Sequence, residues 1–308
     1  MPIKVIIDTD IGENIDDLLA VAFALNSPEF DLLAITTVDG DTRARSRIAR
    51  LVTMTFGQPH LPVCAGYVST MPRGDRPVAP EASVTQGALA RDEIGLAPAC
   101  SLAADDLIAK LAAEHPGEVH LLTLGTMTNL GHALIRYPET ARNLRAVVTC
   151  GGHFARPPVA IGWNLSYDPI AAAITACSGV DWTLLSEGSM SDAALRDEDV
   201  QRIRDAGLPT TGLLARAIDL WKRNKLDAPP TPHLDDVIGL AYLLGEDWVP
   251  TRRGRAIIAI APDRAAELWI EHDPAGPHAL GRALERERAE QLRELVMSRL
   301  LAPARATS

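Results

Sequence analysis

The feature that most constrains the fold is an alternation of short apolar runs with amphipathic segments along most of the chain. Several runs are continuously apolar, which is typical of strands buried on both faces of a parallel sheet. The expected strands are residues 3–8, 32–38, 119–124, 146–150, 182–185, 256–260 and 268–270. Helical spacing of apolar residues predicts helices at residues 15–23, 102–113, 127–136, 170–176, 213–221, 237–244 and 283–301. The alternation therefore predicts an α/β fold: an open, mostly parallel, Rossmann-like sheet flanked by helices.

Length and composition narrow the class of protein. The 308 residues are 47% hydrophobic and can bury one large core, so we expect a single domain, residues 1–308. The net charge of −10 argues against nucleic acid or an anionic membrane as a partner. No apolar stretch approaches the ~20 residues of a membrane span, and the apolar start is too short for a signal peptide. We expect a cytoplasmic protein, and a homodimer or homotetramer.

Four cysteines lie far apart in the sequence and form no CxxC motif. This spacing favours reduced, mostly buried thiols of a cytoplasmic protein over a disulfide framework. The four are Cys64, Cys100, Cys150 and Cys177.

Carboxylates crowd the end of the first expected strand, at Asp8, Asp10, Glu13, Asp16 and Asp17. Ligands of open α/β sheets bind beyond the carboxyl ends of the strands, so this cluster is expected in the binding crevice. Carboxylates at this spacing repel each other unless a cation is present, and an all-oxygen donor set suits Ca²⁺ or Mg²⁺. Favourable placement in a helix's first turn would explain Asp16 and Asp17. It does not explain Asp8 and Asp10, which end an apolar strand.

A second acidic pair precedes a later apolar helix, in TPHLDDVIGLAYLL (residues 231–244). By itself the pair Asp235 and Asp236 could be an N-cap and a first-turn acid. Combined with the first cluster, it could complete the coordination sphere of a metal ion.

Four motifs of the chain resemble those of the inosine-uridine-type nucleoside hydrolases. DTDIG…DDLLAVAFAL resembles the family's N-terminal DxDxGxDD signature, and LLTLGTMTNLGHAL resembles its apolar strand followed by Gly-x-x-Thr-Asn. WNLSYDPIAA and HLDDVIGLAYLL resemble two later elements. The motifs occur in the family's order up to about residue 245, and the first is the most specific of the four.

The resemblance implies the nucleoside hydrolase fold with one tightly bound Ca²⁺ per chain. The implied ligands are Asp10, Asp17, Asp236 and the backbone carbonyl of Leu124. The ion would also hold the ribose 2′- and 3′-hydroxyls and a water, with Asp10 as the catalytic base that activates this water. Asp16 and Asn164 would bind ribose hydroxyls, and Asp8 would support the site from behind. The implied reaction hydrolyses the N-glycosidic bond of a ribonucleoside to ribose and free base, as in purine and pyrimidine salvage.

The chain departs from the family pattern near the metal and ribose. The turn after Gly12 is longer, because Glu13-Asn14-Ile15 stand where many members have one residue. Asp41, in the VDGD segment that ends the second expected strand, stands where asparagine is usual, and we expect it to bind substrate. Gln86 stands where many members have histidine.

Larger departures fall on the side that would hold the base. Gly162 replaces a glutamate that contacts the ribose, and Asp235 replaces a histidine linked to protonation of the leaving group. His233 is a candidate for that acid, and both His233 and Asp235 are expected to contact substrate. The substrate could thus be an unusual ribosyl compound, or the base preference could be altered. Three further residues are weaker candidates for lining the binding crevice: His153, Trp221 and Arg223.

Two other readings remain open. A phosphohydrolase of the haloacid dehalogenase type also begins with Asp-x-Asp at a strand end, but Gly12 stands where it has Thr or Val. Its required lysine could only be Lys222 or Lys225. A non-catalytic or weakly active nucleoside or ribose binder on the same fold is favoured by the missing glutamate and histidine.

Overall fold

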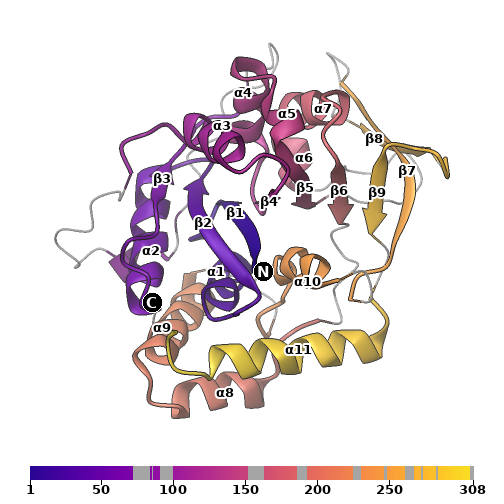
Figure 1. Ribbon diagram of the computed structural model, residues 1–308. Coiled ribbons are helices and arrows are strands. Elements are labelled where there is room, and N and C mark those ends of the chain that lie inside the picture. Colours follow the sequence, from indigo (N-terminus) through magenta and orange to yellow (C-terminus); the bar gives the residue numbers. More distant parts are fainter. Residues whose placement is uncertain are drawn as a thin grey trace.

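The structure, a computed structural model, describes residues 1–71, 84, 86–90, 100–151, 163–185, 193–224, 230–245, 248–260, 267–271, 273–281 and 284–305. Within these residues, nine strands form a sheet in the order β3-β2-β1-β4-β5-β6-β9-β7-β8 (Figure 1). The strands are β1 (Ile3–Thr9), β2 (Phe30–Thr37), β3 (Val63–Ala65), β4 (Val119–Thr123), β5 (Leu144–Cys150), β6 (Trp182–Leu185), β7 (Thr251–Ala259), β8 (Glu267–Glu271) and β9 (His278–Gly281).

The order of the strands reverses beside β1. The chain begins at β1, builds outward through β2 and β3, and then crosses back to β4 on the other side of β1. All neighbours from β3 to β9 pair in parallel, whereas β7 runs antiparallel to β9 and β8. In doubly wound sheets, ligands bind where the strand order reverses, beyond the carboxyl ends of the strands. The predicted fold class is confirmed, and β1 and β4 flank the reversal.

Helices cover both faces of the sheet and give the molecule two apolar cores. One core packs α1 (Asp16–Leu25), α2 (Thr42–Thr55), α8 (Asp197–Asp205), α9 (Pro209–Asn224), α10 (Val237–Leu244) and α11 (Arg286–Leu300) against the sheet. The other packs α3 (Ala104–Glu114), α4 (Thr128–Arg136) and α7 (Pro169–Cys177) against the opposite face. Figure 1 shows this layered arrangement. Shorter helical segments are η1 (Gly87–Ala90), α5 (Thr140–Asn143) and α6 (Trp163–Tyr167).

The apolar patterns did not predict β3, β9, α2, α8 or the shorter helical segments. β3 is only three residues long, and the four residues of β9 include His278 and Gly281, which interrupt an apolar run. α8 is mostly charged, and α2 buries Arg45 along with its apolar face, which breaks the helical pattern of apolar residues.

The cysteines do not all remain reduced, so that expectation is wrong. Cys64 of β3 and Cys100, shortly before α3, form a disulfide, while Cys150 is a buried free thiol and Cys177 an exposed one. Pairing across 36 residues depends on the tertiary fold and leaves no local spacing signal. Disulfides are typical of oxidising compartments and so do not favour a cytoplasmic location. The cytoplasmic location therefore stays a prediction. Among the described helices, none is long and apolar enough to cross a membrane.

Candidate functional site

The turn between β1 and α1 carries the acidic cluster and is held in place by one buried side chain. Gly12 adopts φ +119°, and a Cβ there would lie 2.8 Å from Val84 Cγ1, so only glycine fits without strain. Gln86 is fully buried, and its backbone N–H donates to Gly12 O (2.8 Å). Its side-chain Nε2 donates to Asn14 O (2.6 Å). The long turn between β1 and α1 is thus held in place by Gln86.

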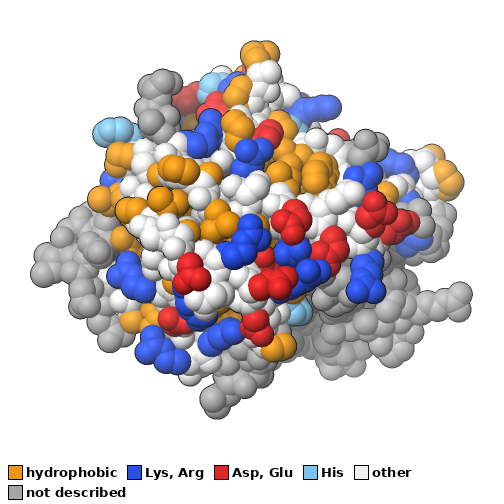
Figure 2. Space-filling view, turned by 90° about the horizontal axis from the view of Figure 1, so that it is seen from below, with side chains coloured by type: hydrophobic (Ala, Val, Ile, Leu, Met, Phe, Trp, Pro, Cys, Tyr) orange, Lys and Arg blue, Asp and Glu red, His pale blue; other side chains and the backbone are white. Residues whose placement is uncertain are grey.

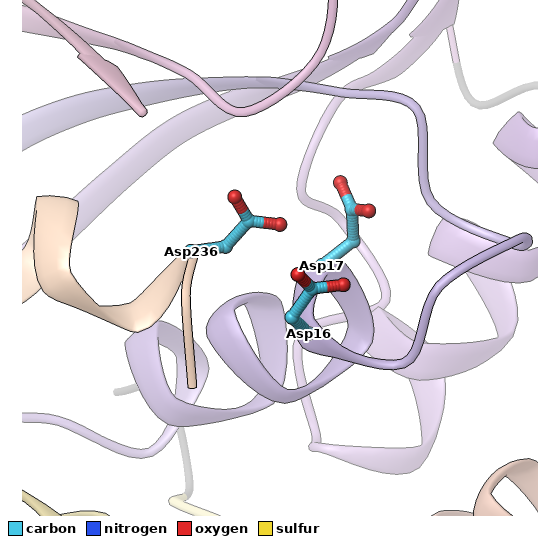
Figure 3. Close-up of side chains that lie close together, drawn as sticks. All are labelled: Asp16, Asp17 and Asp236. Atoms are coloured by element: carbon cyan, nitrogen blue, oxygen red, sulfur yellow. The ribbon is translucent and has the colours of Figure 1, made fainter. Parts of the chain in front are cut away.

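Three aspartates from distant parts of the sequence meet at this turn. One carboxylate oxygen from each of Asp16, Asp17 and Asp236 lies within 4.8 Å of the others, and Figure 3 shows the three side chains gathered between α1 and the start of α10. Asp17 and Asp236 are buried, and Asp16 is half-buried. The hydroxyl of Thr9 donates to Asp17 Oδ1, whereas Asp16 Oδ1 is buried with no hydrogen-bond partner in the described part of the chain. These all-oxygen donors could hold a hard metal ion.

Asp10 lies outside this trio, but its charge raises the pKa of all three aspartates. Burial raises the pKa of both Asp17 and Asp236 well above the usual value, and the nearby charges of Asp10 and Asp16 raise them further. Burial likewise raises the pKa of Asp16 to about 7, with Asp235 and Asp10 as further causes. Carboxylates this crowded need either protons or a cation to neutralise them. The structure therefore brings together Asp16, Asp17 and Asp236, and Asp10 is near enough for its charge to affect all three.

Asp8 lies beneath the cluster and ties three elements together. Its Oδ1 accepts hydrogen bonds from Thr36 Oγ1 (2.6 Å) on β2 and from Asn129 Nδ2 (2.7 Å) on α4. Burial raises the pKa of Asp8 to about 7, against the lowering effect of these two bonds. The asparagine of the Gly-x-x-Thr-Asn motif thereby fixes the end of β1.

The ends of β4 and β5 form the opposite wall. Leu124 N donates to Asp8 O (2.7 Å), and a Cβ on Gly125 would lie 3.0 Å from Asp10 N, so β4 can approach Asp10 only through a glycine. Asn164 of α6 donates from Nδ2 to Leu124 O and to Cys150 O (3.1 Å). The Asn164 amide therefore joins the carbonyl groups that follow β4 and end β5.

Two aspartates of the VDGD segment have different environments. Asp41 is exposed and caps α2, accepting a bond from Ala44 N (2.9 Å). Asp39 is buried and is the positive-φ residue other than glycine in the described part of the chain (φ +62°). Burial raises the pKa of Asp39 to about 6, with the charge of Asp10 as the next cause. Asp39 is thus a member of the cluster that the sequence did not single out, because the motif comparison favoured Asp41.

His233 and Asp235 form a pair at the edge of the cluster. His233 Nδ1 lies 3.8 Å from Asp235 Oδ2, and both side chains are about one-third exposed (32% and 38%). A bridge between His233 and Ala194 fixes the backbone of the segment, with Leu234 N donating to Ala193 O (2.9 Å). The charge of Asp235 helps to raise the pKa of Asp16, so this pair adjoins the acidic site.

The three weaker candidates have separate outcomes. Trp221, on α9, is buried in the apolar core. Arg223 is exposed on α9, and its Nε donates to Asp219 O (3.1 Å). His153 lies outside the described residues, as does Gly162.

Comparison with known proteins decides the family. The model of the inosine-uridine preferring nucleoside hydrolases matches residues 5–294. The chain belongs to this family. It is 32% identical over 262 residues to uridine nucleosidase 1 of Arabidopsis thaliana, covering 82% of this chain and 76% of the relative. It is 29% identical over 292 residues to the pyrimidine-specific ribonucleoside hydrolase RihA of Citrobacter koseri, covering 91% of this chain and 87% of that one.

Solved structures agree on the fold of this nucleoside hydrolase. A plant nucleoside hydrolase superposes with a TM-score of 0.83 at 24% identity, covering 98% of this chain and 100% of that one. A purine-preferring ribonucleoside hydrolase from Gardnerella vaginalis gives a TM-score of 0.81 at 24% identity, covering 97% and 99%. The recognised family and the enzyme class, an N-ribohydrolase acting on N-glycosyl compounds, are confirmed. Family membership removes the phosphohydrolase alternative.

Proposed function

We propose that this protein hydrolyses ribonucleosides to ribose and free base with one Ca²⁺ bound per chain. The observation that carries the proposal is the meeting of Asp16, Asp17 and Asp236 within 4.8 Å, with a buried Asp16 oxygen that has no partner in the described residues. Ca²⁺ binds oxygen at 2.3–2.6 Å, so ligand oxygens on one ion lie at most about 5 Å apart. One ion can therefore touch all three carboxylates, and the hard oxygen donors favour calcium over zinc.

The proposed roles follow the family motifs, because burial alone does not separate metal ligands from sugar ligands: Asp10 and Asp16 are both half-buried. We assign Asp17 and Asp236, which are buried, to the ion, together with Asp10 and Leu124 O. Asp16 is half-buried and reaches the ribose hydroxyls. Asn164, next to Leu124 O, would contact the sugar from the other side. Asp41, the exposed N-cap of α2, would contact the substrate from outside the buried cluster.

The chemistry follows from these placements. When bound, the ion would act as a Lewis acid that orients the sugar diol and makes a water more acidic. Asp10 accepts the proton of the attacking water, and its backbone is held in place by the close approach of Gly125. Cleavage builds positive charge on the sugar, which the surrounding carboxylates stabilise. We assign the side of His233 and Asp235 to the departing base, and His233 to its protonation.

The decisive experiment measures reducing sugar released from uridine, cytidine, inosine and adenosine, with metal-stripped and calcium-reloaded protein. Hydrolysis that disappears on stripping and returns with calcium supports the proposal. Equal turnover by stripped and reloaded protein contradicts the metal assignment. Tight ribose or nucleoside binding without turnover would instead favour the non-catalytic binder.

Release of a free base suits a role in purine or pyrimidine salvage. The homodimeric or homotetrameric state and the cytoplasmic location stay predictions, and light scattering of the purified protein tests the first.

A further inference from the structure

We infer that Arg45 is a positioning residue that sets the metal affinity of the acidic site. The inference rests on the proposed function, because it concerns how the chain prepares that site for calcium. Arg45 belongs to none of the four motifs that point to the family.

The buried position of the Arg45 guanidinium is energetically unfavourable unless hydrogen bonds and negative charges compensate for it. Arg45 is fully buried, although it carries a permanent charge. It also follows shortly after the N-cap Asp41, near the end of α2 where the helix dipole disfavours a cation. A buried charge is strongly destabilising unless it is paired and hydrogen-bonded. The surroundings of Arg45 must therefore supply both hydrogen bonds and negative charge.

The hydrogen bonds come from the ends of two neighbouring strands. Arg45 Nη1 donates to Asp10 O and to Ile11 O (3.1 Å), in the turn after β1. Its Nε donates to Asp39 O (2.7 Å), after β2. One guanidinium thus joins the backbone that carries the proposed base and ligand Asp10 to the strained backbone of Asp39.

The negative charge comes from the acidic site itself. Asp17 and Asp39 are the carboxylates whose charges interact with Arg45. Before calcium arrives, the guanidinium is thus a fixed cation beside these carboxylates. Arg45 therefore holds the backbone of Asp10 in place beside the carboxylates that must bind the ion.

A lysine could not replace it. Arginine presents five N–H donors in a planar fork, whereas lysine has a single ammonium on a flexible stem. Arg45→Lys keeps the charge but cannot bridge the two strand ends through Nη1 and Nε. Removing partners that orient metal ligands typically costs 10–100-fold in metal affinity.

α2 supplies a matched control in Arg47. It lies two residues further along the same helix, and its Nη2 donates to Ala90 O (3.0 Å) of η1 rather than to the turn after β1. Arg47→Lys makes the same chemical change on the same helix away from the carboxylates.

The test is calorimetric titration of metal-stripped full-length protein with calcium, after far-UV circular dichroism has established that each variant is folded. We expect Arg45→Lys to weaken calcium binding by about 10- to 100-fold and Arg47→Lys to change it less than about twofold. Equal affinities of wild type and Arg45→Lys overturn the role of Arg45 and leave the proposed function standing. A wild-type protein that binds no calcium overturns both.

A second measurement keeps the inference testable if Arg45→Lys does not fold. In wild-type protein, the ¹⁵N resonance of Arg45 Nε should shift on addition of calcium, because the same guanidinium bonds through Nη1 to the backbone of the ligand Asp10, while that of Arg47 should stay in place. An Arg45 signal unmoved by saturating calcium contradicts the inference.

Discussion

Gln86 donates from Nε2 to the carbonyl oxygen of Asn14 across 2.6 Å, and this bond fastens the long turn between β1 and α1. The turn carries Asp10 at one end and Asp16 at the other. A side chain far from both in sequence therefore controls where the carboxylates of the site stand.

We expect Gln86→Leu to lower activity more than stability. Losing one hydrogen bond costs about 1 kcal/mol of the free energy of unfolding, whereas a displaced turn moves Asp10 and Asp16 away from the sugar. Urea unfolding and steady-state kinetics measure the two effects. Gln58→Leu is the matched control, because Gln58 Nε2 donates to Leu25 O (3.1 Å) at the other end of α1. If both variants retain full activity, the turn does not depend on Gln86.

The purified protein should contain about one Ca²⁺ per chain. Asp10, Asp17 and Asp236 offer only hard oxygen donors, which is the donor set that calcium prefers. Elemental analysis of protein purified without chelator gives the content. Stoichiometric zinc with no calcium would refute this assignment.

Asp10→Ala should abolish turnover and leave the fold intact, because Asp10 combines the roles of base and ligand. Loss of a catalytic base typically slows a reaction by 10²–10⁴-fold, and loss of a ligand adds to this. Asp31→Ala, at an exposed position on β2, is the control and should behave as wild type. Activity of Asp10→Ala within tenfold of wild type would show that another residue is the base.

The pH dependence of stability should reverse when calcium binds. Burial raises the pKa of Asp8 and of Asp16 to about 7, and raises those of Asp17 and Asp236 as well. Because the folded state favours the protonated carboxyls, the stability they contribute is present below about pH 4 and is lost as the pH rises through about 7. For Asp8 alone this amounts to about 4 kcal/mol.

Metal-stripped protein should therefore unfold at lower urea concentration at pH 8 than at pH 5. Calcium binds the deprotonated carboxylates, so the loaded protein should show the opposite order. Urea titrations at the two pH values, with and without calcium, check the signs. Stripped protein that is more stable at pH 8 would mean that the carboxylates are neutralised by something other than protons.

The enzyme should favour substrates with good leaving groups. Asp235 adjoins the proposed ligand Asp236, so bound calcium should keep Asp235 ionised and make it a poor acid near pH 7. We expect p-nitrophenyl riboside to be hydrolysed far faster than inosine or uridine, and Asp235→Asn to change the rate on the nitrophenyl substrate little. His233→Ala should slow hydrolysis of the natural nucleosides by about 10²-fold or more and spare the nitrophenyl substrate. Inosine turned over as fast as p-nitrophenyl riboside would mean that an efficient acid is already in place.

Local sequence patterns predicted much of the sheet and part of the site. Continuous apolar runs marked the buried parallel strands, and helical spacing marked α1, α3, α4, α10 and α11, because both signals repeat within a few residues. The same patterns failed for α2, whose buried face includes Arg45. They also failed for β3, which is only three residues long, and for β9, whose four residues include His278 and Gly281.

The sequence by itself determined the chemistry of this protein: carboxylates at the end of an apolar strand, a glycine that permits the turn, and a late acidic pair. Only the tertiary structure decided which of these groups meet. It brought Asp236 to Asp16 and Asp17, placed Asp39 rather than Asp41 in the buried cluster, and paired Cys64 with Cys100. It also buried Arg45 and Gln86 against the turn. The physical reason is that the periodicities of strands and helices arise from residues close together in the sequence. These contacts instead join distant segments, which meet only when the strands assemble into the sheet on both sides of β1.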